Sequence, residues 1–290
     1  MRSTKPERPV EPILVKLLSH VNSAARALAL PYFVGGAFAR DLLLSHVHGF
    51  DLPRPTRDVD IGIAVRGWED FDRVKEQLTG THHFLAVKGI THRLLFKAAP
   101  ETRGIYLDIV PFAGVEERDS LLRWPPDGSV VMNVVGFDEA LARAEQIKIS
   151  NDLVVPVASL PGLTLLKLAA WLDRRDHTAR DAVDLLIFFR RYGDAGNIER
   201  LYQEYPHLLE AADFDVECAG ATLLGEDVRA MAKRESYERL SVSYTSTVVQ
   251  GTFLTQVSSG VPEIEGDRVG RAKTLVDAFF TGFGATNESA

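Results

Sequence analysis

Hydrophobic positions in the first half of the chain follow two periods, one typical of helices and one typical of strands. Between residues 11 and 29, and again between residues 68 and 78, apolar residues recur every three or four positions, which predicts amphipathic helices. Several shorter runs are apolar or alternate with polar residues, which is typical of strands; they cover residues 32–34, 58–65, 83–87, 92–97 and 104–112. Helices and strands in this order predict an α+β fold, in which a mixed or antiparallel sheet carries flanking helices.

The second half of the chain has a different pattern. After residue 112 the sequence loosens, and it then predicts a short helix at 137–144 and strands near residues 147–149 and 153–155. We therefore expect residues 1–156 to form a domain built on the sheet and residues 157–290 to form a mainly helical domain. The second domain should contain two helices that are discussed below. The apolar period predicts three more helices, at 196–209, 215–233 and 268–280. Residues 241–259 are rich in Ser and Thr, and we assign no secondary structure to them.

Composition is that of an ordinary globular protein, with 46% apolar and 25% charged residues. No run reaches the roughly 18 apolar residues of a membrane span, so we expect a cytoplasmic protein with no membrane partner. The single cysteine, Cys218, excludes an intramolecular disulfide and a cysteine-based zinc site, and we expect it to be a buried thiol. The formal net charge of −7 gives no overall attraction to nucleic acid, so such binding would need a local basic surface.

Two aspartates occupy one face of the strand expected at residues 58–65. Strand side chains alternate between faces, so Asp58 and Asp60 point one way while Val59 points the other. Two like charges side by side repel each other unless a positive group lies between them. Magnesium fits that role, because it prefers carboxylate oxygens and completes its shell with water and substrate phosphates. The alternative is a strand end with two solvated acids.

A glycine pair lies upstream of this strand. Gly35 and Gly36 stand where the strand at residues 32–34 meets a helix expected at 37–44. Glycine lets the backbone approach a ligand closely, and a helix N-terminus offers amide donors to phosphate; a plain tight turn is the alternative. Arg40, inside the helix, would either reach phosphate or pair with an acid near the metal site. A loop at residues 45–56 would border the nucleotide pocket.

A third acid, Asp108, is the single charged residue in the apolar strand at 104–112. Together, the residues Gly35, Gly36, Asp58, Asp60 and Asp108 resemble the nucleotidyltransferase superfamily, which has the polymerase-beta-like fold. The resemblance implies that the glycine pair contacts a nucleoside triphosphate and that the three acids hold two magnesium ions. A serine is common in that superfamily where Gly36 stands here, so one hydroxyl contact to phosphate is missing.

A second group of charged residues lies in the helical half. Lys167 interrupts an apolar helix, and a lysine in that place must reach the surface or meet an anion, because burial of an unpaired ammonium is costly. Asp181 and Asp184 lie three residues apart on the next helix and therefore share a face. Asp181 also suits the positive N-terminal end of that helix. Lys167 and Asp184 are interpreted as either a buried pair or a catalytic pair.

This second group resembles a motif of the AbiEii-like nucleotidyltransferase toxins of bacterial toxin–antitoxin systems. The motif residues in this sequence are Lys167, Arg174, Arg180, Asp181 and Asp184. The resemblance implies that Lys167 contacts the triphosphate and that Asp184 assists catalysis or structure. With the first domain included, the resemblance covers residues 32 to about 190. One departure is the gap before Arg180, which residues 176–179 make longer than in the family pattern.

These residues predict transfer of a nucleoside monophosphate from an NTP, such as ATP, to an acceptor hydroxyl. Asp58 and Asp60 would bind one magnesium ion, and Asp108 would complete a second or act as general base. Lys167 and Arg174 would neutralise the charge that develops on pyrophosphate. As a toxin, the enzyme would modify tRNA or a protein, and a cognate antitoxin would be its partner.

One group of arginines is the basis for predicting a tRNA acceptor. Two other functions of the protein remain possible. The arginines would form a basic surface for tRNA, or else a solvated helix face interleaved with acids; they are Arg174, Arg175, Arg180, Arg190 and Arg191. The same core would also suit a small-molecule, aminoglycoside-like acceptor, for which the negative net charge is permissive. A non-catalytic nucleotide-binding partner is the third possibility.

Overall fold

The computed structural model describes residues 1–52, 56, 58–99, 101, 103–261 and 266–284. The chain divides into two compact units, Met1–Ser159 and Leu160–Ala290, and each is described by itself. The boundary expected after residue 156 falls inside the last strand of the first unit, so the observed division comes three residues later. Part of the loop expected at 45–56, namely residues 53–55, lies outside the described residues, as do Arg57 and the end of the chain from residue 285.

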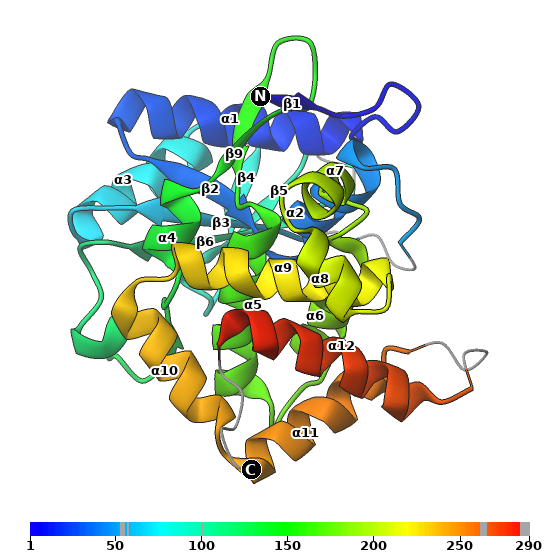
Figure 1. Cartoon of the computed structure of the whole chain (residues 1–290). Helices are drawn as coiled ribbons and strands as arrows, with labels where there is room; N and C mark the ends of the chain where they lie inside the picture. The colour runs from blue at the N-terminus through cyan, green and yellow to red at the C-terminus, as the bar shows by residue number, and fades with distance from the viewer. Residues whose placement is uncertain (53–55, 57, 100, 102, 262–265, 285–290) are drawn as a thin grey trace. The chain divides into compact units, whose positions relative to one another are not determined.

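The first unit is built on one large mixed sheet (Figure 1). Its strand order over the described residues is β1-β9-β10-β2-β3-β6-β5-β4. The strands are β1 (Arg2–Ser3), β2 (Tyr32–Gly35), β3 (Asp58–Ala64), β4 (Phe84–Ala86), β5 (Arg93–Phe96), β6 (Ile105–Phe112), β9 (Glu145–Lys148) and β10 (Val154–Val157). In the centre β3 runs parallel to β6, whereas β2 and β5 run antiparallel to their neighbours β3 and β6. This arrangement confirms the predicted α+β fold with a mixed sheet.

Helices of the first unit follow the predicted positions closely, with one correction. They are α1 (Pro12–Leu28), α2 (Gly36–Asp41), α3 (Trp68–Thr79) and α4 (Phe137–Ala142). A π-helical segment, Leu42–Val47, continues α2 into the first three residues of the expected loop, so the loop prediction is wrong there. Leu42, Leu43 and Leu44 of this segment are fully buried, whereas the three residues beyond the expected helix end are only partly buried.

A small second sheet was not expected from the sequence. It pairs β7 (Leu121–Arg123) with β8 (Val131–Asn133), in the region that loosens after residue 112. Both strands have three residues, and Val131 is 45% exposed. Strands this short carry too few alternating positions to give a recognisable pattern.

The second unit is helical in all its regular described parts, as predicted. Its helices are α5 (Leu160–Arg174), α6 (Arg180–Arg191), α7 (Ile198–Gln203), α8 (Pro206–Ala211), α9 (Val216–Met231), α10 (Arg234–Tyr244), α11 (Thr247–Ser258) and α12 (Arg268–Phe283). The single helix expected at 196–209 is in fact two, because Pro206 cannot continue a helix but suits the first turn of the next. The unassigned stretch 241–259 contains the end of α10 and the whole of α11.

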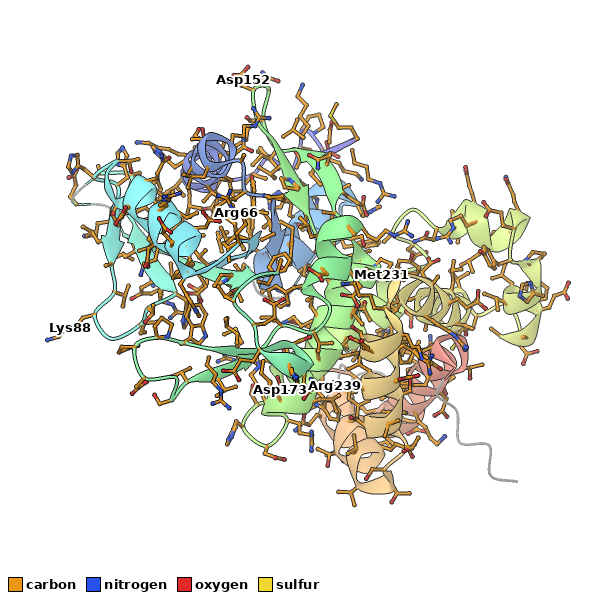
Figure 2. The ribbon with its side chains drawn as sticks, turned by 90° about the vertical axis from the view of Figure 1, so that its left-hand side faces the viewer. Arg66, Lys88, Asp152, Asp173, Met231 and Arg239 are labelled. Atoms are coloured by element: carbon orange, nitrogen blue, oxygen red, sulfur yellow. The ribbon has the colours of Figure 1, made fainter. Side chains whose placement is uncertain are left out.

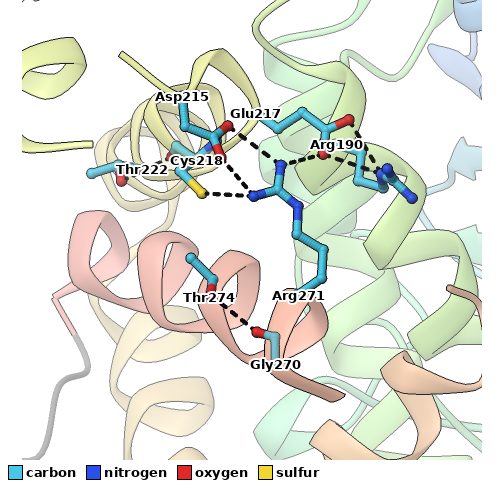
Figure 3. A network of polar contacts seen from close by, with 8 residues as sticks. All are labelled: Arg190, Asp215, Glu217, Cys218, Thr222, Gly270, Arg271 and Thr274. Atoms are coloured by element: carbon cyan, nitrogen blue, oxygen red, sulfur yellow. Dashed lines mark hydrogen bonds and ion pairs between the residues drawn. The ribbon is translucent and has the colours of Figure 1, made fainter. Parts of the chain in front are cut away.

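Close backbone contact and one polar network hold α12 against α9. A Cβ atom on Gly225 would lie 2.2 Å from the carbonyl oxygen of Phe279, so glycine is required for this approach. Arg271 of α12 donates to Asp215 at 2.6 Å and to Glu217 at 2.6 Å, and Arg190 of α6 also binds Glu217 (Figure 3). The hydrogen bonds from Arg271 lower the pKa of Asp215 to about 2.

Cys218 lies in the same network as a buried, free thiol, as predicted. Burial raises its pKa to about 11, and the neighbouring charge of Asp215 acts in the same direction.

None of the helices that the structure describes is both long and apolar enough to span a bilayer.

Candidate active site

Four neighbouring strands bring the glycine pair, two of the predicted acids and an arginine into one row. Gly35 on β2 pairs with Asp60 on β3, Asp60 pairs with Asp108 on β6, and Asp108 pairs with Arg93 on β5. Residues directly opposite each other across a ladder point to the same face of the sheet. Asp58 precedes Asp60 by two positions and therefore points to this face as well. We call Asp58, Asp60, Asp108 and Arg93 the acidic face.

Gly36 follows this row at the start of α2 and lies directly against the carboxylate of Asp60. Its φ angle is +64°, and a Cβ atom there would lie 1.9 Å from Oδ2 of Asp60. Both the backbone conformation and the missing space demand glycine. A serine, the common residue of the resembling superfamily, would not fit here unless Asp60 moved.

Arg93 binds Asp108 through two parallel hydrogen bonds. Its Nε donates to Oδ1 at 2.7 Å and its Nη2 donates to Oδ2 at 2.6 Å, so both carboxylate oxygens accept from one guanidinium. The guanidinium carbon also lies 5.0 Å from the ring centre of Tyr106. Hydrogen bonding to Asp108 raises the pKa of Arg93, and the charges of Asp108, Asp58 and Asp60 act in the same direction.

The sequence prediction missed Arg93. It is the only charged residue of β5, Arg93–Phe96, and it begins this strand, which is the second strand of the predicted hairpin and pairs with the strand of Asp108. Knowledge of which residue of β5 lies opposite Asp108 would have identified Arg93. The alternation of apolar and polar residues does not determine this register.

In the second unit, four charged side chains of α5 and α6 form a second cluster. Nζ of Lys167 lies 2.9 Å from Oδ1 of Asp181 and 2.6 Å from Oδ2 of Asp184. Arg174 binds the other oxygen of Asp181 at 2.7 Å. We call these four residues the paired cluster. The predicted buried pair therefore exists, and Asp181 joins it.

Lys167 stays protonated in this environment. Burial by itself disfavours the ammonium form, but the charges of Asp184 and Asp181 and their hydrogen bonds outweigh it, so the pKa of Lys167 is raised. Asp181 is only 2% exposed in its side chain, and its charge is balanced from both sides by Lys167 and Arg174. Arg180 begins α6, where its backbone N–H donates to Oγ1 of Thr178.

Comparison with known protein families identifies the family of the chain. The family model of the nucleotidyl transferase AbiEii toxin, of type IV toxin–antitoxin systems, matches residues 16–250. The chain belongs to this AbiEii family. It is therefore a nucleotidyltransferase, as the sequence predicted. The match also extends beyond residue 190, where no resemblance was recognised in the sequence, and it includes α9 and α10.

Solved structures with some similarity to this AbiEii family member include an antibiotic-resistance factor and a CCA-adding enzyme. A solution structure of the antibiotic-resistance factor ANT(2'')-Ia has 14% identity and a TM-score of 0.32, covering 57% of this chain and 75% of that one. The Thermotoga maritima CCA-adding enzyme complexed with tRNA has 14% identity and a TM-score of 0.26, covering 96% of this chain and 82% of that one. Among curated proteins, none matches the sequence significantly.

The acids of the AbiEii acidic face differ in how well they suit magnesium. Asp58 and Asp60 are half-buried carboxylates on one face of one strand, a donor set that fits this ion. Asp108 instead gives both oxygens to Arg93. In the described part of the chain, no three acidic, histidine or cysteine side chains are gathered as a metal site. Asp108 as a metal ligand therefore stays a prediction.

Arg40 is buried and paired with its neighbour in sequence. Its Nε and Nη2 donate to Oδ1 of Asp41 at 2.8 and 2.6 Å, while Oδ2 of Asp41 accepts from the backbone N–H of Thr56. The pair thus ties α2 to the segment that leads into β3. The alternative of an ion pair is present, with Asp41 as the acid, and the phosphate contact of Arg40 stays a prediction.

Several arginines of the expected tRNA surface are engaged within the second unit. Arg174 binds Asp181 and Arg190 binds Glu217. Arg175 donates to the carbonyl of Leu172 and lies over the ring of Trp171. These contacts favour the interpretation of an interleaved helix face for Arg174, Arg175 and Arg190, and tRNA binding stays a prediction.

Proposed function

We propose that the acidic face transfers a nucleoside monophosphate from an NTP to an acceptor hydroxyl, with magnesium as the cofactor. The observation that carries this proposal is the contact between Gly36 and Asp60. Because residue 36 has no side chain, its backbone lies directly against the Asp60 carboxylate. A phosphate group bound at the backbone amides of the glycine pair would therefore be close to a magnesium ion held by Asp60.

The residues of the first unit have separate roles in this proposal. Asp58 and Asp60 hold the magnesium ion, which when bound polarises the α-phosphate and lowers the pKa of the acceptor hydroxyl. Gly35 and Gly36 bind the triphosphate through their backbone. Gly36 also leaves room for the carboxylate of Asp60, which occupies the place that a Cβ atom would take. Asp108 completes the negative side of the site.

The two cations of the paired cluster, Lys167 and Arg174, would contact the triphosphate. Lys167 carries a permanent positive charge because its pKa is raised, which suits an anion ligand and excludes it as a general base at neutral pH. Asp184 would orient Lys167, and Arg174 would add a second cation. We propose these roles on the basis of the AbiEii family motif and the observed pairing.

The acceptor proposed is a hydroxyl of tRNA or of a protein, and membership of a toxin family supports a macromolecular target. The same membership implies an antitoxin as the cognate partner. A small-molecule acceptor is the outcome that would replace this part of the proposal.

The experiment compares wild type with Asp60→Asn in the presence of magnesium. Each α-labelled NTP is incubated with the enzyme and with an RNA and protein extract. We expect a labelled RNA or protein in wild type and at least about a 100-fold slower reaction in Asp60→Asn, because the variant lacks one charge that positions the metal. Asp152→Asn is the matched control, because Asp152 is exposed on the turn between β9 and β10 (Figure 2).

Each outcome has a distinct meaning. Equal labelling by wild type and Asp60→Asn would contradict the proposed site. Loss of labelling in Asp152→Asn as well would mean that the assay does not report on the acidic face. No labelled macromolecule, together with pyrophosphate release when a polyhydroxylated small molecule is added, would assign a small-molecule acceptor.

A further inference from the structure

The acidic face contains a cation of its own. Arg93 comes from β5, the strand beyond Asp108, and reaches both oxygens of that carboxylate. Tyr106, on the same strand as Asp108 and two residues before it, supports the guanidinium with its ring. Arg93 is thus held on two sides, and its side chain is 28% exposed while that of Asp108 is 12% exposed.

The charges of these four side chains suit one divalent ion. Asp58, Asp60 and Asp108 contribute three negative charges and Arg93 contributes one positive charge, so their sum is −2. The sum has the magnitude of a single divalent cation. A second divalent ion bound to Asp108 would stand beside the guanidinium, where two like charges repel in a partly desolvated site.

We propose that Arg93 takes the place of a second metal ion in this enzyme. It holds Asp108 as an ion pair, so that Asp58 and Asp60 bind one divalent ion per chain before the nucleotide binds. This inference rests on the proposed function, because it assumes that Asp58 and Asp60 are metal ligands. Arg93 is then a positioning residue, which sets the number of metal ions by controlling Asp108.

The test counts Mn²⁺ ions bound to the full-length protein without nucleotide, by electron paramagnetic resonance titration. We expect one Mn²⁺ per chain in wild type and none in the Asp58→Asn, Asp60→Asn double variant. In Arg93→Gln, Asp108 is released and we expect two Mn²⁺ per chain. The Arg93→Gln, Asp108→Asn double variant removes both partners of the pair, and we expect one Mn²⁺ again.

Several results would overturn the inference. Two Mn²⁺ in wild type, falling to one in Asp108→Asn, would mean that Arg93 leaves Asp108 free to bind metal. One Mn²⁺ in a folded Arg93→Gln would mean that Arg93 does not control the number of ions. If Arg93→Gln does not fold, the test compares the number of bound Mn²⁺ ions in wild type and in Asp108→Asn. One Mn²⁺ per chain in both proteins supports the inference.

A failure of the proposed function gives a different pattern. No Mn²⁺ in wild type, or Mn²⁺ that remains in the Asp58→Asn, Asp60→Asn variant, would refute the metal site itself and the inference with it. In that case the labelling of acceptor by Asp60→Asn would also match wild type. A change confined to Arg93 variants leaves the proposed function intact.

Discussion

The acidic face and the paired cluster are built from the same residue types but differ in charge balance. In the paired cluster, two acids meet two cations, and Asp181 is bound by Lys167 and Arg174 at once. In the acidic face, three acids share one sheet face with Arg93, which binds Asp108. The paired cluster is complete as a set of ion pairs, whereas the acidic face carries surplus negative charge.

This difference separates two kinds of charged site. Ion pairs whose charges sum to zero can stabilise a fold without any ligand, although their burial alone is weak support for stability. A surplus of like charge on one sheet face costs stability and is relieved when a cation binds. Substitutions in the two clusters should therefore change stability in opposite directions.

The largest effect is expected for Lys167→Met. The variant leaves Asp181 and Asp184 without their shared cation in a buried place, and we expect a loss of about 3–5 kcal/mol in the free energy of unfolding. Urea denaturation followed by circular dichroism measures it. The control is the triple variant Lys167→Met, Asp181→Asn, Asp184→Asn, in which most of the loss should be recovered because no buried carboxylate of the cluster remains charged.

The raised pKa of Lys167 gives this prediction a pH signature. The stability that its charge contributes is fully present below its ordinary pKa of 10.5 and is lost as the pH rises through the higher pKa of the folded protein. The difference in the free energy of unfolding between wild type and Lys167→Met should therefore be the same at neutral pH and at a pH of about 10. This difference should become smaller at higher pH. A loss below about 1 kcal/mol at neutral pH would contradict the structural role of the pair.

A smaller effect is expected for Gly36→Ala. The new Cβ atom meets Asp60 and adopts a positive φ angle, and we expect a loss of about 1–3 kcal/mol together with weaker Mn²⁺ binding. Gly89→Ala is the matched control, because Gly89 has a φ of +79° and nothing within 4 Å of its Cβ position. If both variants lose the same stability and bind Mn²⁺ equally, the contact between residue 36 and Asp60 has no role in metal binding.

The smallest effect is expected for Asp58→Asn. Removal of one of the like charges should raise the free energy of unfolding slightly, by less than about 1 kcal/mol, because Asp58 is half-buried. Thermal melting with and without Mn²⁺ measures it, and we expect Mn²⁺ to stabilise wild type but not the variant. Destabilisation of the variant by more than about 1 kcal/mol would identify Asp58 as a structural acid instead.

The sequence predicted the fold of both units because their patterns are local. The alternation that places Asp58 and Asp60 on one face lies within a single strand, and the hairpin of β4 and β5 is short. The helices that carry Lys167 and Asp184 follow from a period of three and four positions. Such patterns need no knowledge of distant contacts.

The sequence did not predict the partners that long-range contacts supply. Arg93 meets Asp108 across a strand pair, and Asp181 joins Lys167 across two helices. The collision between a residue-36 side chain and Asp60 also depends on how α2 packs beside β3. These contacts depend on register and helix packing, which the hydrophobic pattern does not determine.

The order of strands in the first unit has a consequence for synthesis of the chain. β1 pairs with β9 through Arg2 and Ile147, and β2 pairs with β10 through Val34 and Val157. Because the chain leaves the ribosome from its N-terminus, β2 lacks its second neighbour until residue 157 has emerged. The strand that ends in Gly35 therefore has an unpaired edge during most of the translation of its own unit. Contacts between residues this distant in sequence also make folding slow.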